Sequence, residues 1–174
     1  MNTANTSTLI RWAVTRPNPY RLSFACCLLL MCAASLAGEY AYDPNGDPQA
    51  SYDAALQQST EEQKKVLLVF GSDWCPDCRS LNRKMTQEPL ATTISDQFVV
   101  AHVDIGNWDK NMTFTEQFGE PVANGIPSIA IISSDGELLY LSQAGELATS
   151  RSASTEDLNA WFETTLDSLG EHTQ

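Results

Sequence analysis

Cys75 and Cys78 stand three residues apart, just after the apolar run Val66 to Phe70 and just before a helix-compatible stretch at 79–85. A short continuous apolar run that ends at a glycine, here Gly71, predicts a strand buried on both faces. The two cysteines therefore fall in the loop and the first helical turn between a buried strand and a helix.

Hydrophobic periodicity along the rest of the chain predicts alternating helices and strands. A turn at 134–136 joins the last two apolar runs into a hairpin, and Ser154 with Asp157 forms a capping box before the closing helix. We therefore expect an α/β domain whose central mixed β-sheet is flanked by helices on both faces. Helices are expected at 51–64, 79–85, 90–96, 113–118 and 158–166, and strands at 66–70, 98–103, 129–132 and 138–141.

The N-terminal segment has the order of a secretory signal peptide. Three arginines precede an apolar run at 22–37 that ends in the small residues Ser35 and Ala37, and no acidic residue occurs in this segment. A basic region, an apolar region and a small-x-small motif together mark a signal that is cleaved. We expect cleavage after Ala37 and export of the remainder to the periplasm.

Two alternatives for this segment remain open. An uncleaved anchor would hold the protein at the membrane, although 16 apolar residues are fewer than the ~20 that span a bilayer. Lipid attachment at Cys32 is the other alternative, and the bulky Met31 before it fits a lipoprotein signal poorly. In each case the chain from Gly38 onward leaves the cytosol.

Composition excludes one class of partner for the exported part. The chain has 174 residues, near the usual size of one domain, and we expect a linker or extended arm at 38–50 and a single domain at 51–174. Residues 38–174 carry 7 basic and 22 acidic side chains, a net charge of −15. Nucleic-acid affinity comes mostly from basic side chains that displace counterions, so DNA or RNA binding is not expected.

The cysteine pair is the only one left after signal cleavage, because the other three cysteines lie within 22–37. A bridge between residues three apart constrains little chain entropy, so stability does not explain the pair. A structural zinc ion needs about four ligands, and the chain adds only the distant His102 and His172, so no metal is expected. Two interpretations of the pair remain: an inert buried pair and a redox-active pair.

The placement of the pair favours redox chemistry. Thiol–disulfide exchange requires a thiolate, and an ordinary cysteine with a pKa of ~8.5 is mostly protonated at neutral pH. Cys75, at the start of a helix, meets unpaired N–H groups and the positive end of the helix dipole. Cys78, one turn further on, is near enough to resolve a mixed disulfide on Cys75. This chemistry needs no cofactor beyond the dithiol.

The segment Trp74-Cys75-Pro76-Asp77-Cys78, the strand before it and Ile126-Pro127 resemble the thioredoxin superfamily, and in particular exported bacterial thioredoxin-like domains. The resemblance extends from about residue 51 to 166. It implies a thioredoxin-like fold and a thiol–disulfide oxidoreductase that acts on protein thiols and disulfides. It also implies that Pro127 is a cis-proline and that the Ile126 backbone contacts the substrate as an added strand. The alternative is a plain proline at the start of a strand.

The sequence departs from the thioredoxin pattern at three positions. Thioredoxin carries a buried acid six residues before its first cysteine, where this chain has Val69, and His102 falls where a lysine often pairs with that acid. His102 either tunes the redox site or is an ordinary strand residue. The Asp77 carboxylate either raises the pKa of Cys75, which favours a reductant, or faces water at a helix N-terminus. The same two interpretations apply to the Asp73 carboxylate.

Tryptophans near the cysteines are candidates for a substrate surface. Trp74 either forms the floor of that surface beside the thiols or packs in the core. Trp108, in the polar loop after the second strand, is a candidate rim residue, whereas the spacing of Trp161 predicts a core position.

The sequence therefore supports two functional hypotheses from different classes. The first is an exported thiol–disulfide oxidoreductase in which Cys75 attacks and Cys78 resolves. We favour a reductant kept reduced by a membrane electron donor, because Asp77 opposes the thiolate and no long helical insertion is present. The second is a thioredoxin-fold binding or chaperone-like module whose cysteines are not essential. A thiol peroxidase is disfavoured, because no distant resolving cysteine remains.

Overall fold

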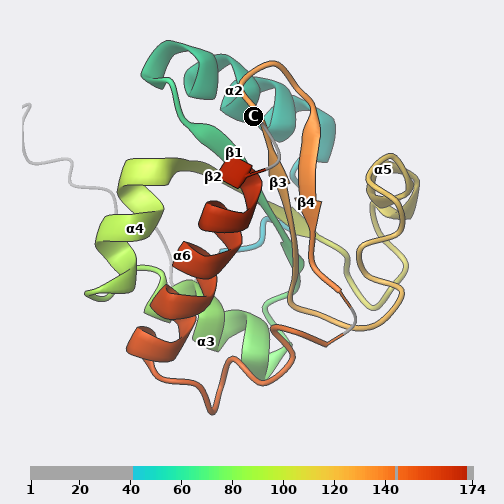
Figure 1. Cartoon of the computed structure of the whole chain (residues 1–174). Coiled ribbons are helices and arrows are strands. Elements are labelled where there is room, and N and C mark those ends of the chain that lie inside the picture. Colours follow the sequence, from blue (N-terminus) through green and yellow to red (C-terminus); the bar gives the residue numbers. More distant parts are fainter. Residues whose placement is uncertain (1–40, 144, 172–174) are drawn as a thin grey trace, which may run out of the picture. The chain divides into compact units, whose positions relative to one another are not determined.

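The computed structural model describes residues 41–143 and 145–171 (Figure 1). The predicted signal segment and its cleavage position lie outside the described residues. Within those residues, no helix has both the length and the apolar character needed to cross a bilayer. The elements are α2 (Pro48–Glu62), β1 (Lys65–Gly71), α3 (Pro76–Lys84), α4 (Leu90–Gln97), β2 (Phe98–Asp104), α5 (Met112–Glu116), β3 (Ser128–Ile132), β4 (Leu138–Leu141) and α6 (Thr155–Glu171).

The four strands form a mixed sheet in the order β2-β1-β3-β4. β1 runs parallel to β2 and antiparallel to β3, and β4 completes the predicted hairpin with β3. The parallel pair needs a crossover connection, which α3 and α4 provide. The predicted α/β class with a central mixed sheet is confirmed.

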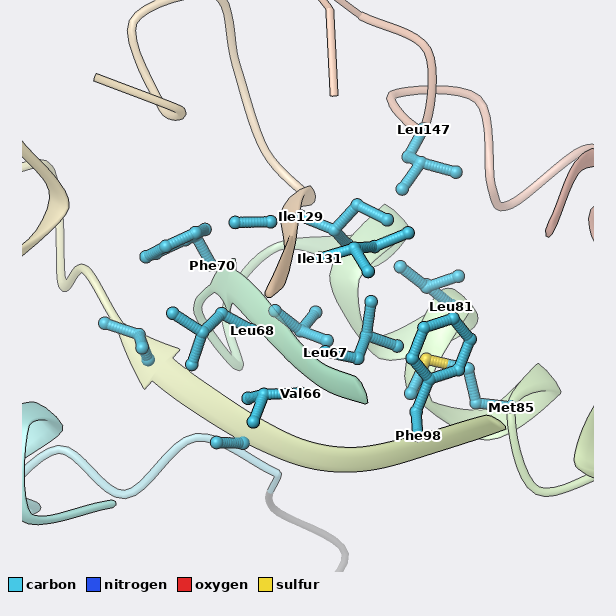
Figure 2. Close-up of a cluster of buried hydrophobic side chains, with 14 of the residues drawn as sticks. Val66, Leu67, Leu68, Phe70, Leu81, Met85, Phe98, Ile129, Ile131 and Leu147 are labelled. Atoms are coloured by element: carbon cyan, nitrogen blue, oxygen red, sulfur yellow. The ribbon is translucent and has the colours of Figure 1, made fainter. Parts of the chain in front are cut away.

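Both faces of β1 are buried, as its apolar sequence predicts. Successive side chains of a strand point to opposite faces, so the run divides between two layers of the core. On one face, Phe98 of β2 packs on Phe162 of α6, with ring centroids 6.0 Å apart. On the other, Phe70 packs on Phe118, which follows α5, at 6.1 Å. Figure 2 shows the β1 side chains among Leu81 of α3, Met85 at the C-terminal end of that helix, and Ile129 and Ile131 of β3.

The first helix of the domain begins three residues earlier than predicted. We expected the first helix from Ser51, but α2 begins at Pro48, because the Asp47 carboxylate accepts hydrogen bonds from the N–H groups of Gln49 and Ala50. An acidic N-cap followed by proline is a helix start, although the same residues also suit a linker. Residues 41–47 form an arm that packs on the domain and buries Tyr42, which is 2% exposed.

The last helix begins as the capping box predicts. The Asp157 N–H donates to Ser154 Oγ at 3.0 Å, and the Ser154 N–H donates to the Asp157 carboxylate at 3.1 Å. These reciprocal bonds satisfy donors that a helix start leaves unpaired. α6 lies beside α4 (Figure 1) and turns Leu158 and Phe162 into the core.

Candidate active site

Cys75 occupies the N-cap position of α3, and Pro76 takes the first helical position. The Cys75 N–H donates to the Ser72 carbonyl at 3.0 Å, which closes the loop after β1. The Cys78 N–H donates to Cys75 Sγ at 3.2 Å. The sulfur thus receives one of the N–H groups that a helix start leaves unpaired, and the helix dipole adds to this stabilisation of a negative charge. This is the strand, loop and helix arrangement that the sequence predicts.

The two thiols differ in accessibility. Both are free in the structure, but Cys75 is 5% exposed and Cys78 is completely enclosed. A disulfide approaching from solvent therefore meets Cys75 first. Within 41–143 and 145–171, no group of three or more Cys, His, Asp or Glu side chains is placed to hold a metal ion.

The environment lowers the pKa of Cys75 to about 6 from an ordinary value near 9. A hydrogen bond from the Cys78 thiol is the largest cause, and the backbone N–H groups of Cys78 and Asp77 add to it. Burial and the Asp77 carboxylate act in the opposite direction. The pKa of Cys78 is raised, first because its thiol donates that hydrogen bond and second because it is buried. Cys75 therefore carries the thiolate at neutral pH, and Cys78 keeps its proton.

Asp77 neither sets the pKa of Cys75 by its charge alone nor simply faces water. Its carboxylate opposes the Cys75 thiolate, as predicted, but this effect is outweighed by the hydrogen bonds to the sulfur. The carboxylate also accepts the Arg151 N–H at 2.9 Å and lies 3.6 Å from the Arg151 guanidinium. Asp77 thus ties the loop before α6 to the first turn of α3, and Lys84 ties the same loop through the Ser150 carbonyl at 2.7 Å.

Ile126 and Pro127 lie beside the attacking sulfur. The peptide bond between them is cis, which confirms the geometry predicted for Pro127. Cys75 Sγ lies 3.8 Å from the Ile126 carbonyl oxygen and donates to it when protonated. The residues that precede β3 therefore form one wall of the site around Cys75.

Trp74 is exposed and does not pack in the core. It is 47% exposed, and its indole N–H donates to the Gly106 carbonyl at 2.7 Å. Its ring lies 5.3 Å from that of Trp108, which is also 47% exposed. The loop after β2 thus brings the two tryptophans together beside the cysteines, an arrangement suited to an aromatic contact surface.

A family model described as thioredoxin-like matches residues 47–134. The chain belongs to the thioredoxin-like family. With its Cys75–Cys78 dithiol, this thioredoxin-like domain is a thiol–disulfide oxidoreductase, as the sequence predicts. A comparison with curated protein sequences gives no significant match.

Solved structures agree with this assignment. A disulphide isomerase from Xylella fastidiosa Temecula1 is 32% identical, covers 76% of this chain and 98% of its own, and superposes with a TM-score of 0.69. The DsbD C-terminal domain of Neisseria meningitidis, in the oxidised form, is 18% identical over 69% of this chain and 97% of its own, with a TM-score of 0.51. A thioredoxin from Thermus thermophilus is 16% identical over 79% and 95%, with a TM-score of 0.52. The last two show the fold alone.

His102 lies on β2 of the thioredoxin-like domain, in register with Val69 of β1. Burial lowers its pKa to about 4, so its ring is neutral at pH 7. Its Nε2 is buried without a hydrogen-bond partner among the described residues, and its ring meets the edge of Tyr42 at 5.2 Å. The predicted tuning role of His102 stays a prediction.

Tyr42 is the residue near the site that the sequence analysis did not single out. It belongs to the arm, yet it lies against Gly71 and Cys78. A pocket of about 760 Å³ between the arm and the loops after β1 and β2 is lined by Tyr42, Ser72, Trp74 and Asp104, among others. Tyr40 and Tyr42 in a polar, proline-containing stretch were the available signal, because burying an aromatic ring favours packing of such a segment on the domain.

Proposed function

We propose that this protein works outside the cytosol as a reductant of disulfides in protein clients. The observation that carries the proposal is the contrast between the two thiols: Cys75 is a stabilised thiolate that keeps a small exposed fraction, and Cys78 is a protonated, fully enclosed thiol behind it. Cys75 attacks a client disulfide, and one client sulfur leaves as a thiol. Cys78 then attacks Cys75 Sγ, the second client thiol leaves, and a Cys75–Cys78 disulfide remains.

The pKa of Cys75 favours a reductant over an oxidant. The more a dithiol protein stabilises its thiolate, the more strongly oxidising it is, and the attacking cysteine has a pKa of ~7 in thioredoxin and ~3.5 in the strong oxidant DsbA. A pKa of about 6 is nearer to the thioredoxin value. The charge of Asp77 does not set the direction, because hydrogen bonds outweigh its effect on the pKa of Cys75.

The reduction potential of the Cys75–Cys78 pair tests the direction. Equilibration with glutathione buffers, followed by quantification of the two thiols, should give a value near the −270 mV of thioredoxin. A value near the −120 mV of DsbA would reverse the proposal in favour of an oxidase.

Export and cleavage after Ala37 rest on the N-terminal sequence order. In an oxidising compartment, a reductant needs a supply of electrons, so we propose a membrane electron donor as a partner. Intact-mass analysis of the protein from the periplasmic fraction should give a chain that starts at Gly38. A mass that includes residues 1–37 would indicate an anchor, and a lipid-modified Cys32 would indicate a lipoprotein.

Client segments are proposed to bind along the Ile126 backbone and the exposed Trp74 ring. Both flank Cys75, and the pocket beside Trp74 leaves room for client side chains. A Cys75→Ser/Cys78→Ser double variant separates this proposal from a binding or chaperone-like module. The double variant of a reductase should lose client reduction completely. If the protein is instead a binding or chaperone-like module, the same variant should still bind its clients.

A further inference from the structure

Gly71, the last residue of β1, allows two polar groups to approach each other. A Cβ atom at this position would lie 2.5 Å from the Tyr42 hydroxyl oxygen and 2.9 Å from Cys78 Sγ. Both distances are far below normal contact, so any larger residue would force one of the two groups away. Glycine at this position thus leaves one small space that the Tyr42 hydroxyl and the resolving thiol share.

The Tyr42 hydroxyl lacks a hydrogen-bond partner among the described residues. Its oxygen is buried, and no described residue meets the distance and angle requirements of a hydrogen bond with it. A buried polar atom without a partner costs free energy, so such an atom beside a reactive group calls for an explanation. The backbone of the arm is fastened nearby: the Ala41 N–H donates to Asp73 at 3.3 Å, and Lys110 donates to the Pro44 carbonyl at 2.9 Å.

We propose that the Tyr42 hydroxyl is the hydrogen-bond donor that stabilises the Cys78 thiolate while Cys78 resolves the mixed disulfide. The proposal rests on the function proposed above, which supplies that mixed disulfide. In this step the Cys78 S–H bond breaks, the Cys78 sulfur forms a bond to Cys75 Sγ, and the bond from Cys75 Sγ to the client sulfur breaks. The client sulfur leaves with the electron pair and gains the proton, so no further reactant is needed. Tyr42 keeps its own proton and is a positioning residue.

The surroundings of Tyr42 make it a donor and prevent it from acting as a base. Burial raises its pKa well above 10, and the sulfurs of Cys78 and Cys75 and the Asp73 carboxylate raise it further. From β2 it faces the neutral ring of His102. Tyr42 is therefore protonated throughout the working pH range. The Ser72 backbone N–H also favours the Cys78 thiolate, so the sulfur has two donors once the proton has left.

The role fits the departure of this chain from the thioredoxin pattern. Where thioredoxin places a buried acid, β1 has Val69, which is 1% exposed. A carboxylate takes the proton from the resolving thiol, whereas a phenol lowers the free energy of the anion that forms. The arm thus supplies from outside the sheet a group that β1 does not carry.

The test separates the two chemical steps in the full exported domain. Reduced protein is mixed with the chromogenic disulfide dithiobis(nitrobenzoate), whose first released thiol reports attack by Cys75 and whose second reports resolution by Cys78. In Tyr42→Phe we expect an unchanged first phase and a second phase about tenfold slower. The pH at which the second phase is half-maximal should rise by about one unit. Tyr52→Phe, which removes a hydroxyl from α2 near the turn at Gly136, should change neither phase.

Each other outcome has a defined meaning. A Tyr42→Phe variant whose second phase stays within twofold of the wild type, with the same pH dependence, overturns the role of Tyr42. So does a variant that no longer unfolds cooperatively, because the hydroxyl would then be structural. A wild-type protein without a first phase refutes the proposed function instead, so the two failures are distinguishable.

Discussion

Val69 of β1 and His102 of β2 occupy paired register positions in the parallel part of the sheet, two residues before the strands end at Gly71 and Asp104. The aliphatic side chain and the partly buried neutral imidazole therefore lie side by side, on the strands that lead to the cysteine loop. Neither group takes up a proton at neutral pH, since burial holds the pKa of His102 at about 4. Proton movement in the resolving step consequently depends on groups outside this pair.

The partly buried imidazole of His102 makes stability depend on pH. Between pH 6.5, where a free histidine titrates, and pH 4, the unfolded chain binds a proton that the native domain excludes. The free energy of unfolding should therefore fall as the pH drops through this window, by about 3 kcal/mol from this residue. Urea denaturation at several pH values measures it.

A His102→Phe variant provides the control for that experiment, because it keeps an aromatic ring against Tyr42 and removes the titrating group. Its free energy of unfolding should decline less than that of the wild type between pH 6.5 and 4, and the difference between the two curves isolates the imidazole. Parallel curves would mean that His102 takes up its proton in the native domain.

Alkylation of Cys75 should follow a titration with a midpoint near pH 6, because only the thiolate reacts with iodoacetamide. The largest cause of this low pKa is the hydrogen bond from the Cys78 thiol, so Cys78→Ala should raise the midpoint by about one to two pH units. Cys78→Ser keeps a donor and should raise it less. Mass spectrometry assigns the alkylated residue, and a wild-type midpoint above pH 8 contradicts the site described above.

Replacement of Asp77 by asparagine should lower the pKa of Cys75 further. The amide oxygen still accepts the Arg151 N–H, but the negative charge that opposes the thiolate is gone. We expect the alkylation midpoint to move to lower pH and the reduction potential to become less negative. Asp73→Asn is the control. The wild-type Asp73 carboxylate accepts the Ala41 N–H of the arm, and its replacement should leave the alkylation midpoint of Cys75 unchanged within experimental error. An unchanged midpoint in Asp77→Asn would mean that solvent screens the Asp77 charge.

Much of the fold could be predicted from the sequence, because each element carries a local signal. Val66 to Phe70 has the continuous apolar pattern of a doubly buried strand, and the Ser154 and Asp157 pair fixes the start of α6. The position of Cys75 at a helix start also follows from local order, since a buried strand and a short loop precede the helix and Pro76 suits its first position. These predictions depend on neighbours in the sequence and not on distant contacts.

Other features of the site could not be predicted, because they depend on segments that are distant in the sequence. The net pKa of Cys75 results from several opposing contributions, and hydrogen bonds to its sulfur outweigh the effect of the Asp77 charge. The arm was expected to be a linker or an extended arm, since its prolines and acids give no periodicity, and only the fold places Tyr42 against Cys78. The bond between Asp77 and Arg151 joins residues 74 positions apart.

The last prediction concerns the aromatic surface beside Cys75. Trp108→Ala removes the ring that packs on Trp74 and leaves the hydrogen bond to Gly106, so Trp74 should be less firmly oriented as a contact for clients. We expect the rate of client reduction to fall severalfold, while the reaction with a small disulfide, which needs only the Cys75 thiolate, stays unchanged. Stopped-flow assays on a disulfide-bonded protein and on dithiobis(nitrobenzoate) compare the two rates.

Trp108→Gly is the matched control for stability. The backbone of Trp108 has a φ of 59°, in the left-handed region that favours glycine, so the glycine variant should unfold at a higher urea concentration than the alanine variant. Both lack the indole ring. If the ring acts as a substrate contact, the two variants lose client reduction equally despite their different stabilities. If client reduction instead follows stability, with glycine near the wild type and alanine below it, Trp108 serves the fold of the loop and not the client surface.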